Sequence, residues 1–136
     1  AQFIRNAVRG EPIVLKSAGT QCFTFCHVAD AVQGLLLTCL KGAPGEAYNI
    51  AGPGMAITLR ELAELLAART GTTVAYAQPD AVESRGFSTA VHAVLDGGKI
   101  AKLGFIPRYA VGDGVLRTVA ILRAEDPRHA PEPTAP

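Results

Sequence analysis

Apolar residues recur along this chain at two spacings, which predict short strands alternating with amphipathic helices. Where they return every three or four residues, one apolar helix face is expected. Where short β-branched or aromatic runs lie between Gly, Pro and Ser residues, strands are expected. The expected helices span residues 3–9, 28–41, 59–70, 98–103 and 111–124, and the expected strands span residues 12–16, 22–27, 47–50, 72–77 and 91–95. The alternation predicts an α/β fold class, in the form of a mixed α+β lobe.

Start signals and apolar stripes make three of these helices the clearest. Thr58 and Glu61 form a capping box, in which the hydroxyl accepts a hydrogen bond from the amide three residues on and the carboxylate reaches back to the Thr58 amide. Asp30 lies in the first turn of the 28–41 helix, where a carboxylate stabilises the positive end of the helix dipole. The apolar stripe of that helix comprises Val32, Leu35, Leu36, Cys39 and Leu40, and the buried face expected of the last helix comprises Val115, Leu116, Val119 and Leu122.

Composition limits the classes of function. The chain has 136 residues, of which 49% are hydrophobic and 18% charged, which predicts one core domain over residues 1–124. Its 13 Lys and Arg against 12 Asp and Glu leave a net charge of +1, so no cationic excess is present to bind nucleic acid. The longest apolar run, residues 35–37, is far too short to span a membrane, and no signal peptide is visible. Residues 125–136 are Pro-rich without an apolar period, which predicts a disordered tail.

The three cysteines indicate neither a disulfide framework nor a metal site. Their odd number favours a reducing, cytoplasmic compartment. Cys22, Cys26 and His27 match no common zinc-ligand spacing, and strand alternation turns His27 away from both thiols. The same alternation separates Cys26 from His27 as a nucleophile and its base. We therefore expect packing roles here, with no metal and no catalytic thiol.

Motifs that bind phosphates or activate water do not occur in the sequence. There is no G-x-G-x-x-G after a strand, no G-x-x-x-x-G-K-[ST] and no H-E-x-x-H. The triplet Gly52–Gly54 precedes a helix, but it is too short and lacks a third glycine, so a plain turn is the better interpretation. His92 lies in an expected strand and His129 in the expected tail, so neither is placed for acid–base catalysis. We expect no catalytic residue in this chain.

Five motifs nevertheless occur in a recognisable order. Residues 12–30 read PIVLKSAGTQCFTFCHVAD and residues 46–51 read EAYNIA. Residues 58–63 read TLRELA, residues 102–107 read KLGFIP and residues 113–117 read DGVLR. In order and spacing, these motifs resemble the NAD-dependent nucleotide-sugar epimerases and dehydratases of the extended short-chain dehydrogenase/reductase family. The resemblance covers residues 2–124.

The resemblance implies the C-terminal, substrate-binding part of such an enzyme, without a complete Rossmann domain. In the intact parent, expected to be a bacterial cytoplasmic enzyme, NAD would remove a hydride from the sugar of a nucleotide sugar and return it. The family's cofactor glycines and its Y-x-x-x-K pair do not occur here, so we expect this chain to bind no NAD and to be inactive alone. Its expected partners are the nucleotide-sugar substrate and the N-terminal Rossmann half of the same protein. A start at Ala1, inside an expected helix, agrees with a fragment.

The resemblance also implies substrate-contacting positions. They are Val14, Leu15, Lys16, Phe23, Phe25, Arg85 and Ser88. Residues 14–16 match the strand that contacts the base, and Phe25 matches an aromatic position. Phe23 stands where the family has a phosphate-binding arginine, and a phenyl ring offers no bidentate fork to a diphosphate. Arg85 and Ser88 fall near the family's R-x-x-D, with Ser88 in place of the acid.

Other interpretations of the same residues stay open at this point. Val14 and Leu15 suit the core strand of any fold, the two phenylalanines could anchor a helix, and a loop arginine such as Arg85 is often only solvated. In function, the first alternative is a non-catalytic nucleotide-binding or regulatory module. The second is an assembly domain that forms a homodimer through an exposed apolar face.

Overall fold

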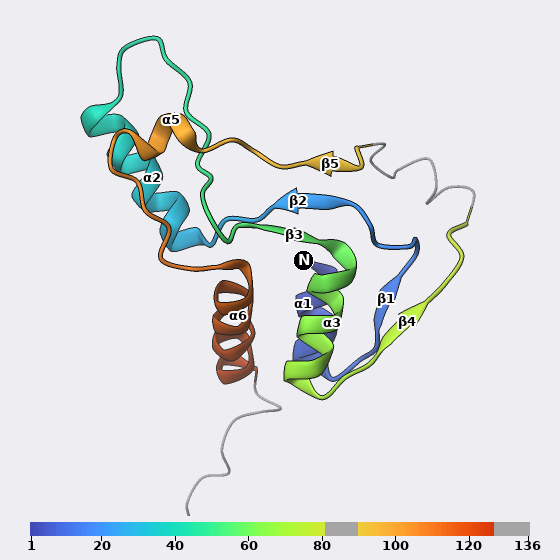
Figure 1. Ribbon diagram of the computed structural model, residues 1–136. Helices are drawn as coiled ribbons and strands as arrows, with labels where there is room; N and C mark the ends of the chain where they lie inside the picture. Colours follow the sequence, from blue (N-terminus) through green and yellow to red (C-terminus); the bar gives the residue numbers. More distant parts are fainter. Residues whose placement is uncertain (81–89, 127–136) are drawn as a thin grey trace, which may run out of the picture.

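Short strands alternate with helices in the computed structural model, which describes residues 1–80 and 90–126 (Figure 1). The helices are α1 (Gln2–Arg9), α2 (Val28–Lys41), α3 (Leu59–Thr70), α5 (Gly98–Ala101) and α6 (Val111–Glu125), and the strands are β1 (Ile13–Leu15), β2 (Cys22–Thr24), β3 (Ala56–Thr58), β4 (Val74–Tyr76) and β5 (His92–Ala93). This arrangement confirms the mixed α/β fold class. The last helix continues to Glu125, one residue into the expected tail, whose residues 127–136 lie outside the described part.

The strands form two small sheets. In the first, β1 and β4 pair in parallel, so that Leu15 lies opposite Tyr76 at their carboxyl ends. In the second, β2 lies between β3 and β5, antiparallel to β3 and parallel to β5. The long excursions between β1 and β4 and between β2 and β5 carry the helices, as parallel pairing requires.

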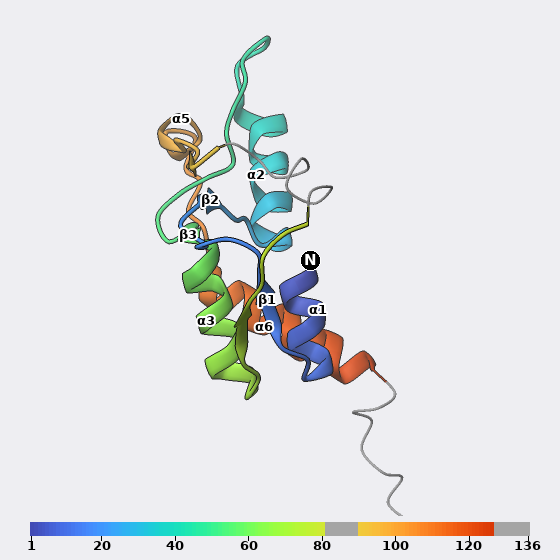
Figure 2. The ribbon, with the colours of Figure 1, turned by 90° about the vertical axis from the view of Figure 1, so that its right-hand side faces the viewer.

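The larger core joins α1, α3 and α6 to β1. Ile13 and Leu66 are fully buried in it, and the period of the α3 sequence places Leu62 and Leu66 on its inner face. The capping box is confirmed, since Thr58 Oγ1 accepts from the Glu61 amide and Glu61 Oε2 accepts from the Thr58 amide. The Thr58 amide, and secondarily the Thr58 hydroxyl, donate to Glu61 Oε2 and lower the pKa of the Glu61 carboxyl group. Figures 1 and 2 show these three helices grouped together, away from α2 and α5.

Arg123 ties the ends of these helices together. Its Nη2 donates to the Ala7 carbonyl at 2.9 Å and to the Thr70 carbonyl at 3.4 Å, in the last turns of α1 and α3. Both carbonyls lie at the negative end of a helix dipole, where a cation is stabilising. A single guanidinium on α6 therefore links three helices.

A smaller core lies between α2 and α5. Met55, Ile100 and Phe105 are buried in it, and Leu37 and Tyr48 pack against them. The segment that precedes α6 is joined to the start of α2 through Asp30, which is fully buried. Asp30 Oδ1 and Oδ2 each accept a backbone N–H at 3.0 Å, from Arg108 and Tyr109 respectively. Asp30 therefore has the structural role that was expected. Its hydrogen-bond partners, the Arg108 and Tyr109 amides, could not be predicted from its place in the first turn of the helix.

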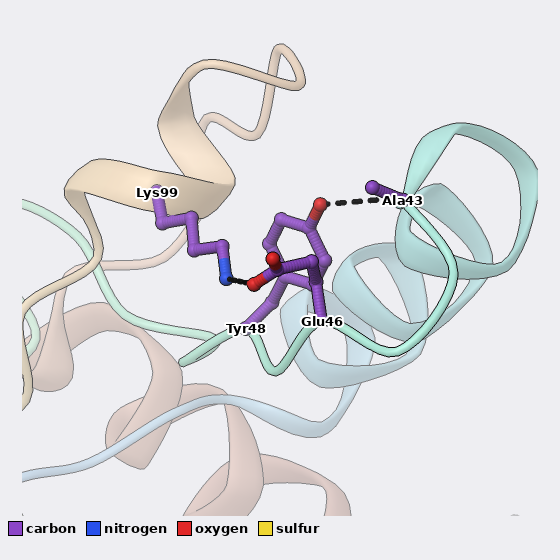
Figure 3. A network of polar contacts seen from close by, with 4 residues as sticks. All are labelled: Ala43, Glu46, Tyr48 and Lys99. Carbon is purple, nitrogen blue, oxygen red and sulfur yellow. Dashed lines mark hydrogen bonds and ion pairs between the residues drawn. The ribbon is translucent and has the colours of Figure 1, made fainter.

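The prediction of a strand over residues 47–50 is wrong. The segment is extended in Figure 1, but it pairs with no strand among the described residues. Side chains hold it instead: Lys99 forms an ion pair with Glu46 and lies 4.7 Å from the Tyr48 ring centre, and Tyr48 Oη accepts from the Ala43 amide (Figure 3). These residues do favour an extended backbone, but a β-strand also needs a neighbouring strand with which to form hydrogen bonds.

Two further strands differ from expectation. The sequence does not predict the strand β3, because three residues are too few to show an alternation of apolar and polar positions. It forms because its backbone pairs with β2. The 22–27 strand ends at Thr24, because His27 becomes the N-cap of α2, its Nδ1 accepting from the Ala29 amide at 3.3 Å.

The apolar stripe of α2 faces solvent. Val32, Leu35, Leu36 and Leu40 are 49–82% exposed, and the buried positions of this helix are Asp30 and Gly34. We refer to these four side chains as the α2 apolar face. On α6, Val119 is buried as expected, whereas Leu122 is 39% exposed.

Candidate functional site

A cleft opens at the carboxyl ends of the two parallel strands β1 and β4. Its volume is about 430 Å³, and it is lined by Leu15, Lys16, Ser17, Ala18, Arg60, Tyr76, Ala77 and Gln78. Residues that follow parallel strands meet at one sheet edge, and in α/β proteins ligands bind outside such carboxyl ends. The pairing of β1 with β4 therefore assembles the cleft from segments about sixty residues apart in sequence.

One wall of the cleft is held in place by Arg60, the second residue of α3. Its Nε and Nη2 donate to the Ala18 carbonyl at 2.9 and 2.7 Å, and its backbone amide donates to the Gly19 carbonyl at 2.9 Å. Ser17 Oγ accepts from the Gly19 amide at 3.2 Å. The loop after β1 is thus fastened both to itself and to α3, so the cleft wall is formed before any ligand arrives.

Two of the residues implied by the resemblance line this cleft. Leu15 extends from the larger core to the cleft floor and is only 2% exposed, and Lys16 is half-buried at its edge. Val14 pairs with Ala75 and is not among the lining residues. Arg85 and Ser88 lie outside the described residues. Contact of these five residues with a substrate stays a prediction.

The two phenylalanines form a pair away from the cleft. The rings of Phe23 and Phe25 meet edge to face, with centres 6.4 Å apart and planes at 78°. Phe25 also packs against the larger core, and neither ring lines the cleft. The packing interpretation accounts for these contacts, and a substrate-binding role for either ring stays a prediction.

Sequence reasoning did not find Arg60, Tyr76 and Gln78 as cleft residues. Arg60 lies inside the capping box, where a polar residue is unremarkable. Tyr76 ends β4 and Gln78 follows it, and the sequence does not indicate which strand pairs with β4. The available signal was the pair of strands ending in Leu15-Lys16 and Tyr76-Ala77, which become neighbours only if the two strands are parallel.

The turn at Gly52–Gly54 does not offer an open backbone to a phosphate group. The triplet Gly52–Gly54 forms a turn closed by the Met55 amide on the Gly52 carbonyl, as expected. A Cβ on Gly52 would lie 2.9 Å from Pro107 Cγ, so the backbone there is already covered by the protein itself. No step of cofactor chemistry is therefore assigned to this part of the chain.

Metal and thiol chemistry have no support in the described part of the chain. No group of three His, Cys, Asp or Glu side chains is close enough there to hold a metal ion. Burial, and secondarily the nearby Asp30 carboxylate, raises the pKa of the Cys26 thiol, which disfavours the thiolate a nucleophile needs. Within residues 1–80 and 90–126, no helix has the length and apolar character needed to cross a membrane.

Comparison with known proteins shows which enzymes this chain resembles. Residues 1–51 match the model of the NAD dependent epimerase/dehydratase family. The chain is 32% identical to a dTDP-glucose 4,6-dehydratase of Actinoplanes over 126 residues, which are 90% of this chain and 37% of the relative. It superimposes on the crystal structure of the dTDP-glucose 4,6-dehydratase from Streptomyces venezuelae with a TM-score of 0.73 and 30% identity, over 96% of this chain and 39% of that one. The first 51 residues thus match the NAD dependent epimerase/dehydratase family, and 90% of the chain is similar to a part of a dTDP-glucose 4,6-dehydratase.

Other enzymes are similar to this chain over shorter or more divergent stretches. UDP-glucuronic acid decarboxylase 6 of Arabidopsis thaliana is 41% identical over 64 residues, which are 47% of this chain and 18% of that protein. The UDP-glucose 4-epimerase of Thermotoga maritima, solved with UDP-glucose, matches 90% of this chain and 38% of its own length, with a TM-score of 0.74 and 25% identity. The chain spans well under half the length of these relatives. Its similarity thus extends to enzymes of three different outcomes.

Proposed function

We propose that this chain is the substrate-binding portion of an enzyme that acts on a nucleoside-diphosphate sugar. The observation that carries the proposal is the match with a dTDP-glucose 4,6-dehydratase over 90% of this chain but only 37% of the relative. In the parent, NAD would take a hydride from the sugar and return it, with epimerisation or loss of water as the net result. The chain alone binds the nucleotide and turns nothing over.

The cleft supplies the chemistry that such a portion needs. The ring of Tyr76, which is 61% exposed, offers apolar surface to a base. Ser17 and Gln78 offer a hydroxyl and an amide to its polar edge. Because the loop after β1 is fastened by Arg60, these groups bind without first being ordered, and ordering costs affinity. Their role is to hold and orient the ligand.

The remaining functions belong to the rest of the parent, which we propose to be an N-terminal Rossmann half in the same cytoplasmic protein. That half would hold NAD and the catalytic tyrosine and lysine. The covering of Gly52 by Pro107 is in keeping with this division, because the glycine triplet of this chain leaves no open backbone for a phosphate. The seven positions implied by the resemblance, Arg85 first among them, remain proposed substrate contacts.

Titration calorimetry with UDP, dTDP and NAD tests the proposal. We expect the chain to bind at least one nucleoside diphosphate and to give no heat with NAD, because the cleft accepts one nucleotide and no cradle for two is present in the described part. Adenosine serves as a control for non-specific stacking on Tyr76. Binding of NAD, or no binding of either diphosphate, would contradict the proposal.

The α2 apolar face favours a second role, in assembly. Three of its four side chains, Val32, Leu36 and Leu40, border a hollow of about 430 Å³, which Arg108 and Tyr109 also line. The unpaired extended segment at residues 47–50 packs against the smaller core beside the same helix. Exposed apolar surface of this kind is usually covered by protein. We propose that the Rossmann half covers it in the parent, and that a second copy of this chain covers it in isolation.

Light scattering over a range of concentrations tests this assembly role. We expect a concentration-dependent dimer that the double substitution Leu36→Gln and Leu40→Gln shifts at least tenfold toward monomer, since about 1.5–3 kcal/mol accompanies burial of each such side chain. Leu122→Gln, on α6, is the matched control and leaves the dimer unchanged. A monomer at every concentration would contradict the role.

A further inference from the structure

The hollow beside α2 is long enough to hold a helix. Its α2 wall runs from Ala29 to Leu40, about 16 Å or three helical turns, and includes three side chains of the α2 apolar face. Arg108 and Tyr109, from the segment that precedes α6, form the opposite wall. A groove of this kind accepts an amphipathic helix that lays its apolar stripe along the groove. We refer to it as the α2 hollow.

Arg108 gives one wall of the α2 hollow a positive charge. Its backbone amide donates to the buried Asp30 carboxylate at 3.0 Å, which fixes the position of this residue. Its side chain is exposed, and within residues 1–80 and 90–126 its guanidinium forms no hydrogen bond or ion pair. No Asp or Glu is among the described residues that line the hollow, where Gln33 adds an uncharged polar group. The hollow therefore places a cation beside apolar surface without a carboxylate of its own.

Arg117 of α6 adds a second cation at the same end. Its guanidinium carbon lies 5.8 Å from the centre of the Tyr109 ring, and the Tyr109 amide is held by Asp30. Asp113, in the first turn of α6, forms no ion pair with either arginine in the described part of the chain. Two like charges beside one apolar surface attract a partner of the opposite charge and disfavour a cationic one.

A second copy of this chain would not neutralise these charges. A symmetric dimer brings the same patch from both copies, so it adds a second cationic hollow and no carboxylate from the hollow's lining. A helix with a carboxylate beside its apolar stripe pairs with the guanidinium instead, and ion pairs between arginine and carboxylate are among the stronger hydrogen-bonded contacts in proteins.

We infer that the α2 hollow docks an amphipathic helix whose apolar stripe is flanked by Asp or Glu, with one of these carboxylates paired to Arg108. The inference rests on the proposed assembly role and names the chemistry of the partner. In the parent, this helix belongs to the part of the protein outside this chain, which spans 37% of a relative's length.

Two synthetic helical peptides test the inference on the whole chain. Both carry leucines spaced three and four residues apart in one stripe, which is flanked by Glu in one peptide and by Lys at the same positions in the other. Calorimetry measures their affinities below the concentration at which the chain dimerises, and amide chemical shifts locate the binding. We expect the Glu peptide to bind about fivefold or more tightly than the Lys peptide, with shift changes along residues 29–40 and at residues 108–109.

Charge variants of Arg108 separate the ion pair from apolar contact. Arg108→Gln should remove the preference for the Glu peptide, and Arg108→Glu should reverse it. Arg108→Gln keeps the backbone amide that donates to Asp30, so its circular dichroism and melting curve should match those of the unsubstituted chain. Arg69→Glu, which reverses an exposed charge in the last turn of α3, is the matched control and should keep the preference. Leu36→Gln should weaken both peptides equally, because it removes apolar contact that both make.

The outcomes distinguish this inference from the assembly role. Equal affinities of the two peptides, or a preference that survives in Arg108→Gln, would overturn the inference and leave the assembly role standing. Absence of binding by both peptides would also overturn it, and light scattering then decides the assembly role separately.

Discussion

Replacement of Asp30 by alanine is expected to lower the free energy of unfolding by about 3–5 kcal/mol. Asp30 is fully buried, and its two carboxylate oxygens accept the backbone N–H groups of Arg108 and Tyr109, 78 and 79 residues away. Alanine leaves both part-buried amides without this acceptor, and an unsatisfied donor costs about 1–3 kcal/mol. The contact is also the polar link between the start of α2 and the segment that leads into α6.

Urea unfolding followed by circular dichroism measures this effect. The free energy of unfolding of Asp30→Asn should lie between those of Asp30→Ala and the unsubstituted chain. The asparagine carbonyl still accepts one of the two N–H groups. Asp113→Ala, at an exposed position in the first turn of α6, is the matched control and should change stability by no more than about 0.5 kcal/mol. A loss below about 1 kcal/mol in Asp30→Ala would show that the carboxylate does not anchor this segment.

Gly97→Ala is the second substitution with a large expected effect, a loss of about 3 kcal/mol. A Cβ at this position would lie 1.8 Å from the Ala51 carbonyl oxygen and 2.5 Å from its carbon. Both are backbone atoms of a residue that is only 2% exposed, so the clash cannot be relieved by turning a side chain. The φ of Gly97 is −94°, which any residue adopts, so the cost comes from the close approach alone.

The adjacent glycine provides the control for this experiment. A Cβ on Gly98 meets only the flexible Asp96 carboxylate, at 3.1 Å, and lies in the first turn of α5, where alanine is the better helix former. Gly98→Ala should therefore leave the melting temperature unchanged or raise it slightly, while Gly97→Ala lowers it. Equal melting temperatures for the two variants would mean that the Ala51 and Gly97 segments are not packed this closely.

Helices could be predicted well from this sequence because their signals are local. The period of Leu62 and Leu66 and the capping box at Thr58 act within one or two turns, and α2 has the bounds that its pattern indicated. The helical spacing of apolar residues does not reveal whether an apolar stripe is buried by other parts of this chain. The α2 apolar face has the spacing of a core face and is exposed, since nothing in the described residues covers it.

Strands were predicted less well because a strand depends on residues far away. The β-favouring residues 47–50 have no partner and form no ladder, whereas β3 has little sequence signal and forms one with β2. The cleft depends on the same kind of long-range pairing. Leu15 and Lys16 were expected through the family resemblance, but Tyr76 and Gln78 join them only because β4 pairs with β1 in parallel.

Mapping of amide chemical shifts in the ¹⁵N-labelled chain during titration with UDP or dTDP tests the central claim most directly. The account predicts changes concentrated at residues 15–18, at Arg60 and at residues 76–78, which line the cleft. Amides of the α2 apolar face should stay unchanged at constant protein concentration. Changes concentrated at the hollow beside Leu36 and Arg108, or no changes at all, would contradict the account.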